Sequence, residues 1–195
     1  METERFSINS SYYFRFLSES DATQTYLNWL SDIEVTEFLE VRHTKFNISD
    51  IKLYIKSFKG STSKYLFGIF SHETNEHIGN VTIYNINKKT GVFDIGYLIG
   101  NKNHWGSDAG ITTILFSLHY AFDKLDLVML KAGIYSNHVK SRFLLKKIGC
   151  TEVERIEGKF LYNKKPITEV IYSMSNKEWS SFKEKYEITV FKECF

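Results

Sequence analysis

The chain has 195 residues, of which 43% are hydrophobic and 25% are charged. That length and composition suit one domain with its own core, and they exclude an intrinsically disordered chain and a collagen-like fibre. The 25 basic and 23 acidic side chains leave a net charge of only +2, which argues against a nucleic-acid partner bound through bulk charge.

The cysteines and the first ten residues bear on where the protein works. Cys150 and Cys194 form neither a disulfide framework nor a close metal-binding pair, which favours ordinary thiols in a reducing compartment. The opening segment METERFSINS is charged and has no apolar stretch of the kind that a signal peptide carries. No window approaches about 18 consecutive apolar residues, and the histidines show no metal-ligand spacing. We therefore expect a cytoplasmic protein with no membrane partner and no metal.

The first third of the chain predicts one strand and two or three helices. Aromatic residues at 12–17 are typical of a strand. Apolar residues then return at helical spacing over 22–30, 33–39 and 51–58, and a polar stretch at 40–47 predicts a loop. These helices precede the main run of strands.

The middle of the chain predicts an antiparallel meander that leads into a helix. Strands are expected at 65–70, 77–86 and 92–100, because short apolar runs alternate with hairpin-length polar turns. After the third strand the apolar spacing changes to three and four, which predicts an amphipathic helix over 108–124. The last strand of the meander therefore enters a helix through a short loop.

The remaining elements complete a mixed sheet. A strand is expected at 127–134, a helix at 139–148, and a final hairpin with strands at 150–162 and 167–174. The order β-α-α-β-β-β-α-β-α-β-β predicts an α/β (α+β) fold with a single, mixed, partly parallel central sheet.

The domain prediction follows from this order of elements. We expect one domain over residues 1–175, because no linker, repeat or low-complexity tract interrupts it. Residues 176–195 are expected to form a helical tail of unassigned role, with a helix over 178–186.

The segment from Ile99 to Ile111, IGNKNHWGSDAGI, carries the strongest chemical signal. A strand enters a glycine-bearing loop that opens a helix, so free backbone N–H groups gather at the helix N-terminus and favour a phosphate or pyrophosphate. Gly106 and Gly110 would let the backbone approach such a ligand closely. The alternative, of equal weight, is a tight turn with Ser107 or Asp108 as the helix N-cap.

Four stretches carry a family resemblance through their order and spacing: FDIGYLIG (93–100), WGSDAG (105–110), SNHVKSRFLLKKIGC (136–150) and, near the start, YLNWLSDIEVTEFLE (26–40). They resemble the GNAT superfamily of acetyl-CoA-dependent N-acetyltransferases, in the branch with the RimJ/RimL-like proteins. The resemblance covers residues 11–175. It implies acetyl-CoA as cosubstrate and a GNAT-like sheet that splays at the acetyl-CoA cleft.

The resemblance also implies which residues bind acetyl-CoA. They lie at the end of the third meander strand, in the glycine-bearing loop and at the start of the later helix: Leu98, Ile99, Trp105, Gly106, Ser107, Asp108, Ala109, Gly110, Ile111, Asn137, His138 and Ser141. The chain departs from the family pattern at three positions. Asp108 stands where the family has a second glycine, Trp105 stands where it has Arg or Gln, and Cys150 stands where it has phenylalanine. The family's asparagine aligns with His138, or with Asn137 after a one-residue shift. We expect Asp108 to cap the helix rather than to face the pyrophosphate.

Direct attack of an amine on the thioester requires a base, an oxyanion donor and a leaving thiolate. The resemblance places the oxyanion donor at the backbone of Tyr97 or Leu98. The tyrosine acid of many relatives is missing here, because its position is Leu145, or Leu144 under the shifted count. Ser141 is the remaining hydroxyl on that helix, and an ordinary serine near a helix N-terminus is an equal alternative.

Asp94 is the favoured general base. Strand alternation places it with Gly96 on one face, and its apolar neighbours would raise its pKa. A solvated strand carboxylate is the competing interpretation. Glu37, Glu40 and His43 are alternative bases from the opening helices and the loop.

The opening helices are expected to cover the acceptor, as the family resemblance implies. Glu37, Arg42 and His43 are therefore the predicted substrate-binding residues. Arg42 could pair with an acidic or phosphate-bearing acceptor, whereas a surface Arg–His pair is the plainer interpretation.

Two classes of function follow. The first is an N-acetyltransferase that transfers the acetyl group of acetyl-CoA to a primary amine, with a small amine such as an amino sugar favoured and a protein N-terminus, of the ribosomal-protein type, as the alternative. The second is a non-catalytic CoA-binding or interaction module on the same fold, favoured by Asp108 and the missing tyrosine. An unrelated nucleotide-binding protein is disfavoured, because no P-loop or dinucleotide motif is present. We expect a monomer or a homodimer.

Overall fold

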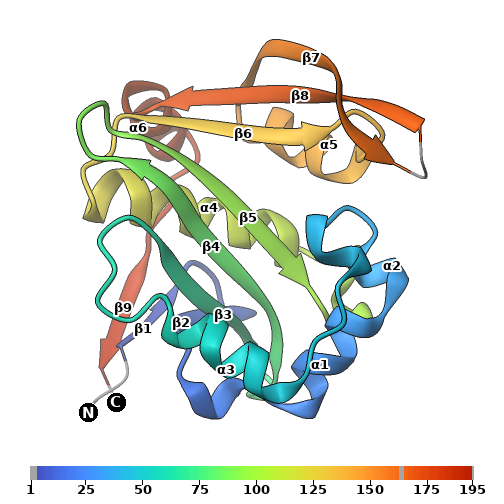
Figure 1. Ribbon diagram of the computed structural model, residues 1–195. Helices are drawn as coiled ribbons and strands as arrows, with labels where there is room; N and C mark the ends of the chain where they lie inside the picture. Colours follow the sequence, from blue (N-terminus) through green and yellow to red (C-terminus); the bar gives the residue numbers. More distant parts are fainter. Residues whose placement is uncertain (1–3, 163–164, 195) are drawn as a thin grey trace.

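The computed structural model describes residues 4–162 and 165–194 (Figure 1). Within them a nine-stranded mixed sheet has the order β7-β8-β6-β5-β4-β3-β2-β1-β9. Its strands are β1 (Glu4–Ser7), β2 (Tyr12–Phe16), β3 (Tyr65–Ser71), β4 (His77–Asn87), β5 (Val92–Ile99), β6 (Met129–Tyr135), β7 (Thr151–Tyr162), β8 (Lys165–Ser175) and β9 (Phe191–Cys194). The α-helices are α1 (Gln24–Ser31), α2 (Ile33–Thr36), α3 (Ile48–Lys56), α4 (Ala109–Leu118), α5 (Val139–Lys147) and α6 (Asn176–Lys185), with shorter helical turns η1 (Glu19–Asp21), η2 (Glu40–His43), η3 (Lys102–His104) and η4 (His119–Lys124).

Two hydrophobic clusters divide the helices between the faces of the sheet. The larger cluster joins the strands to α4, α5 and α6, which contribute Phe116, Leu145 and Trp179. The smaller cluster contains Trp29 from α1 and Ile51 from α3, and Figure 1 shows α3 in front of the sheet and α4 behind it. Because side chains alternate along a strand, each central strand contributes to both layers.

Strand β5 is paired along its length on one side and only at its start on the other. β4 pairs with it in antiparallel register as far as Gly79 and Ile99. β6 pairs with it in parallel, and only opposite Val92 and Phe93. Beyond this point β5 and β6 diverge (Figure 1). The predicted single mixed sheet, partly parallel and splayed, is confirmed.

The two ends of the chain form structure that the sequence did not predict. β1 and β9 have four residues each and pair with one another in antiparallel register. Such short strands have no usable alternation, and although β1 also pairs with β2, its pairing with β9 joins segments almost a whole chain apart. The predicted helical tail therefore consists of α6 followed by a strand, and Trp179 of α6 is fully buried.

Smaller differences concern loops. The polar stretch at 40–47 contains the 3₁₀ turn η2. The predicted final hairpin is β7–β8, although residues 163–164 of its turn lie outside the described residues. Among the helices that the structure describes, no span is long and apolar enough to cross a membrane.

Candidate active site

The open edge of β5 is the central feature of the site. The Gly100 N–H donates to the Ile78 carbonyl at 2.8 Å, and antiparallel pairing alternates along β5 from this pair. The backbone groups of Leu98 therefore point to β4, whereas those of Tyr97 and Ile99 point toward the gap that β6 leaves. Of the two expected oxyanion donors, the Tyr97 N–H is the one on the open edge.

Asp94 is a half-buried carboxyl at the mouth of this gap. Burial is the main cause that raises its pKa to about 7. Hydrogen bonds from the Ile95 N–H, at 2.7 Å, and from the Tyr84 hydroxyl lower the pKa in part. The charge of Glu169 raises it and that of Lys159 lowers it. The expected upward pKa shift is confirmed, and the carboxyl changes protonation near neutral pH.

Each of the two diverging strands carries a glycine near this carboxyl, and only Gly96 on β5 leaves open room, because Gly133 on β6 is covered by Glu169. A methyl group at Gly96 on β5 would meet only Thr82 Oγ1 at 3.3 Å and Tyr84 Cε1 at 3.5 Å. A methyl group at Gly133 on β6 would instead meet Glu169 Oε1 at 2.2 Å. The Glu169 side chain therefore lies across Gly133, and a larger residue there would displace it.

A row of polar side chains connects β5 to α5. Ser141 is buried, and its Oγ lies 3.1 Å from Tyr97 Oη and 2.9 Å from His138 Nε2. Burial lowers the pKa of His138 to about 4, so its ring is neutral at physiological pH and stacks on Phe38 with centroids 4.0 Å apart. Of the two alternatives for the family's asparagine, His138 makes this contact, whereas Asn137 is exposed.

The loop between β5 and α4 is anchored by a side chain of β2. Tyr12 Oη lies 3.0 Å from both Ser107 Oγ and His104 Nδ1. Ser107 Oγ accepts the Ala109 N–H at 3.1 Å and so caps the helix. Gly106 has a φ of +80°, which glycine adopts without the penalty that a side chain brings.

Asp108 does not cap the helix, so that prediction is wrong. It stands at the N-cap position, but its side chain makes no capping hydrogen bond. Its Oδ2 accepts from Asn9 Nδ2 at 2.8 Å instead, a contact between distant segments that draws the carboxylate aside. Ser107 caps in its place. Within residues 4–162 and 165–194, no acceptor contacts the N–H groups of Gly110 and Ile111.

Trp105 and two lysines flank the same loop. The indole N–H of Trp105 donates to the Ile99 carbonyl at 2.8 Å. The ammonium groups of Lys102 and Lys140 each lie 5.6 Å from the centre of its ring. Lys102 also pairs with Asp32 at 2.7 Å. The loop therefore combines free N–H groups with the positive charge of Lys140 from α5, whereas Lys102 is paired with Asp32 and Glu34.

Two of the three predicted substrate-binding residues connect the opening helices to β7. The Tyr162 hydroxyl donates to Glu37. Arg42 donates to the Leu161 carbonyl at 2.7 Å and lies over the Tyr162 ring, 5.9 Å from its centre. His43 is exposed. The Arg42 guanidinium thus holds the hairpin in place, and Glu37 lies at the same junction.

Sequence reasoning missed Glu169, Lys159, Tyr84 and Asn9. Glu169 had a usable signal, because it is a lone carboxylate among apolar residues of a predicted strand, as Asp94 is. It is only 6% exposed. Lys159, Tyr84 and Asn9 had no such signal in the sequence, because their roles depend on contacts between separate strands and turns.

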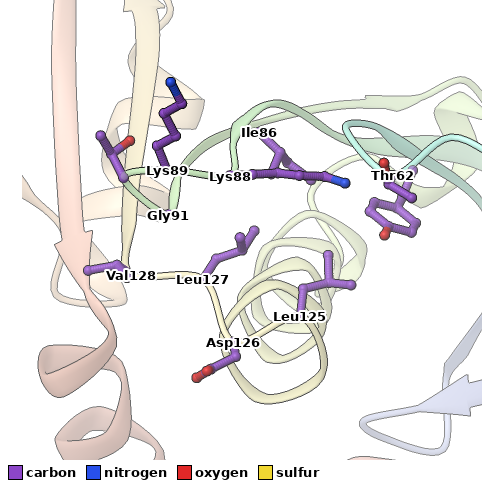
Figure 2. A pocket seen from close by; sticks show the side chains of 11 residues that line it. Thr62, Ile86, Lys88, Lys89, Gly91, Leu125, Asp126, Leu127 and Val128 are labelled. Carbon is purple, nitrogen blue, oxygen red and sulfur yellow. The ribbon is translucent and has the colours of Figure 1, made fainter.

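A hollow elsewhere on the surface is separate from this site. Figure 2 shows it between the hairpin around Lys88 and Gly91 and the loop from Leu125 to Val128. It lies beside the start of β5, whereas the loop at 101–108 follows the end of β5. No residue that the sequence singled out for catalysis or binding lines it.

Comparison with known proteins identifies the class. A model of the acetyltransferase (GNAT) domain family matches residues 12–151. The chain therefore belongs to the GNAT acetyltransferase family and is an acetyl-transferring enzyme. An N-acetyltransferase named p20, from Bacillus licheniformis and described as uncharacterized, is 29% identical over 124 residues, which are 60% of this chain and 67% of that protein.

Solved structures share the fold at low sequence identity. Spermidine N-acetyltransferase from Vibrio cholerae, in complex with CoA and spermine, has a TM-score of 0.80 at 17% identity and covers 88% of this chain and 99% of its own. Ribosomal-protein-S5-alanine acetyltransferase from Vibrio fischeri has a TM-score of 0.77 at 18% identity, with coverages of 90% and 98%. Each is similar to this chain in fold, and their acceptors differ from one another.

Proposed function

We propose that this enzyme transfers the acetyl group of acetyl-CoA to a small primary amine, in the gap between β5 and β6. One observation carries the proposal. The Tyr97 N–H lies on the open edge of β5, and the half-buried Asp94 lies on the same strand, on the face next to the opening helices. An oxyanion donor and a base of suitable pKa thus border one gap.

The loop before α4 fits the pyrophosphate of acetyl-CoA. The N–H groups of Gly110 and Ile111 are open, and Asp108 is turned toward Asn9. Helix N-termini favour such anions through these N–H groups and the helix dipole. Lys140, beside Trp105, adds a positive charge. The donor supplies an activated acetyl group as a thioester.

The chain's own groups then handle two protons and one developing charge. Asp94 takes a proton from the acceptor ammonium, and the free amine attacks the thioester carbonyl carbon. The C–N bond forms, and the Tyr97 N–H donates to the oxyanion. When the C–S bond breaks, the CoA thiolate leaves, and the second proton of the attacking nitrogen passes through Ser141 or water to the sulfur. Ser141 is buried within reach of Tyr97 and His138, and the neutral His138 ring orients its hydroxyl.

We propose a small acceptor because contacts between the opening helices and β7 restrict the space on the acceptor side of the gap. Arg42 and Glu37 tie the opening helices to β7, and Phe38 stacks between His138 and Tyr162. A small amine such as an amino sugar fits this confinement better than a protein N-terminus. The alternative acceptor is a protein N-terminus, which the ribosomal-protein acetyltransferase with this fold supports. That likeness also supports placement in the RimJ/RimL-like branch.

The proposed location is a reducing compartment such as the cytoplasm, which the free, buried thiol of Cys150 supports. We propose a monomer or a homodimer that acts without nucleic acid or membrane.

Calorimetric titration with acetyl-CoA tests the donor site. Gly106→Asp places a carboxylate beside the proposed pyrophosphate, whereas Gly106→Asn is its uncharged control, since both residues tolerate positive φ. We expect saturable binding by the wild type, weakened about 100-fold or more by Asp and much less by Asn. Equal effects of the two substitutions would exclude a nearby anion.

A panel of amines tests turnover, with release of free CoA thiol as the readout. Turnover with small primary amines supports the proposal, and turnover with N-terminal peptides alone favours the alternative acceptor. Binding of acetyl-CoA without turnover across both panels would indicate a non-catalytic module.

A further inference from the structure

Glu169 and Lys159 form an ion pair at the acceptor side of the gap. Glu169 on β8 is buried, and its carboxylate accepts from the ammonium of Lys159 on β7. The side chain of Glu169 is 9% exposed, whereas that of Lys159 is 43% exposed. The pair therefore joins a fixed carboxylate to an ammonium that solvent can reach.

The backbone around this pair is shaped to make it. A register shift between Ile156 and Phe160 interrupts the pairing of β7 with β8. Gly158 lies within this bulge with a φ of +63°, and bulges re-aim the side chains that they carry. Gly133 gives Glu169 its path, because any larger side chain would collide with the carboxylate.

The pair faces the base that the proposed mechanism uses. Asp94 senses both partners, since the charge of Glu169 raises its pKa and that of Lys159 lowers it. Glu169 reaches across β6 toward β5, which places its carboxylate on the same face as Asp94 and Gly96. An acceptor amine beside Asp94 would therefore also be exposed to the charges of the ion pair.

We propose that the Lys159–Glu169 pair sets the charge selectivity of the acceptor site, with Lys159 as the residue that determines specificity. This inference rests on the proposed function. The Lys159 ammonium occupies the carboxylate that the far ammonium of a diamine would otherwise bind. The wild-type enzyme therefore favours acceptors with one positive charge, a class that includes amino sugars.

The reason is competition between two chemically similar groups. A Lys side chain and an alkyl diamine both present a primary ammonium at the end of a methylene chain, but the lysine is tethered and therefore present at high effective concentration. A buried carboxylate without a partner is strongly unfavourable. Removal of the lysine thus leaves the Glu169 carboxylate free to bind an external ammonium. Removal of both charges removes this binding site.

The test compares butylamine with 1,4-diaminobutane, which differ by one amino group on the same carbon chain. The full-length proteins are the wild type, Lys159→Met and the double variant Lys159→Met/Glu169→Gln. Lys147→Met, at an exposed position of α5, controls for the loss of one lysine charge. We expect the diamine-to-monoamine ratio of kcat/KM to rise at least about tenfold in Lys159→Met. It should return to the wild-type value in the double variant and stay unchanged in Lys147→Met.

A binding measurement keeps this test independent of turnover. We expect 1,4-diaminobutane, but not butylamine, to raise the melting temperature of Lys159→Met and of no other variant. If no primary amine is acetylated, the proposed function fails, and the melting shifts still decide the inference. An unchanged ratio and no selective stabilisation in Lys159→Met would overturn it. A raised diamine-to-monoamine ratio that persists in the double variant would also overturn the inference, because Glu169 would then not be the group that binds the second ammonium.

Discussion

The two edges of β5 belong to one strand but differ in how far they are paired with a neighbouring strand. Toward β4, the strand is paired along its length, and its backbone groups are used by the sheet. Toward β6, pairing stops after Phe93, and the groups of Tyr97 and Ile99 point into a gap. The closed edge stabilises the fold, and the open edge is where we propose that the chemistry takes place. Interrupted strand pairing can therefore be the way in which a stable sheet presents backbone donors to a substrate.

Asp94→Asn should have the largest effect, because it removes the proposed base from the open side. We expect kcat/KM to fall by a factor of about 10²–10⁴. In the wild type the rate should rise with pH through about 7, since Asp94 accepts a proton only after it has lost its own. The asparagine variant should lose this rising limb, as measured by a pH–rate profile.

Tyr84→Phe is the matched control for that profile. The Tyr84 hydroxyl lowers the pKa of Asp94 through a hydrogen bond. Its removal should move the rising limb to higher pH and leave the maximal rate nearly unchanged. A limb that stays in place in both variants would assign the titration to another group.

Gly79→Ala tests the closed edge. A methyl group there would lie 2.2 Å from the Leu98 carbonyl oxygen, which belongs to the backbone and has no room to move. We expect the free energy of unfolding to fall by about 3 kcal/mol or more, as measured by urea denaturation. A loss below about 1 kcal/mol would mean that β4 and β5 can separate at little cost.

Gly96→Ala is the corresponding change beside the open edge. Its methyl group would meet neighbours no closer than 3.3 Å, so the free energy of unfolding should change by less than about 1 kcal/mol. The methyl group enters the proposed acceptor space, and kcat/KM for the amine should fall about tenfold. The affinity for acetyl-CoA, measured by calorimetry, should stay the same. Equal losses of amine and acetyl-CoA binding would contradict an acceptor site at Gly96.

Ser141→Ala should have the smallest effect. A CoA thiolate leaves without strong acid assistance, so we expect kcat to fall by less than about tenfold, below the usual range for a general acid. Tyr97→Phe removes the same hydrogen bond from the other end and keeps the backbone N–H. The two variants should therefore behave alike in steady-state kinetics. A loss of 10²-fold or more in Ser141→Ala alone would make the serine an essential acid.

Much of the fold followed from local patterns. The meander, the amphipathic helix α4 and the final hairpin were predicted because alternation and helical spacing reflect which side chains are buried. β1 and β9 were missed because four-residue strands carry no such pattern, and their pairing joins opposite ends of the chain. The same reasoning explains the error at Asp108, whose carboxylate is drawn away by Asn9 from another turn.

The sequence by itself determined the order of the elements from β2 to α6, the glycine-bearing loop before α4 and the apolar surroundings that raise the pKa of Asp94. These properties depend on neighbours along the chain. Only the tertiary structure decided that the Tyr97 N–H, and not that of Leu98, lies on the open edge, and that Glu169 and Lys159 meet beside Asp94. Strand pairing and the register of a bulge set those contacts, and both arise between segments far apart in sequence.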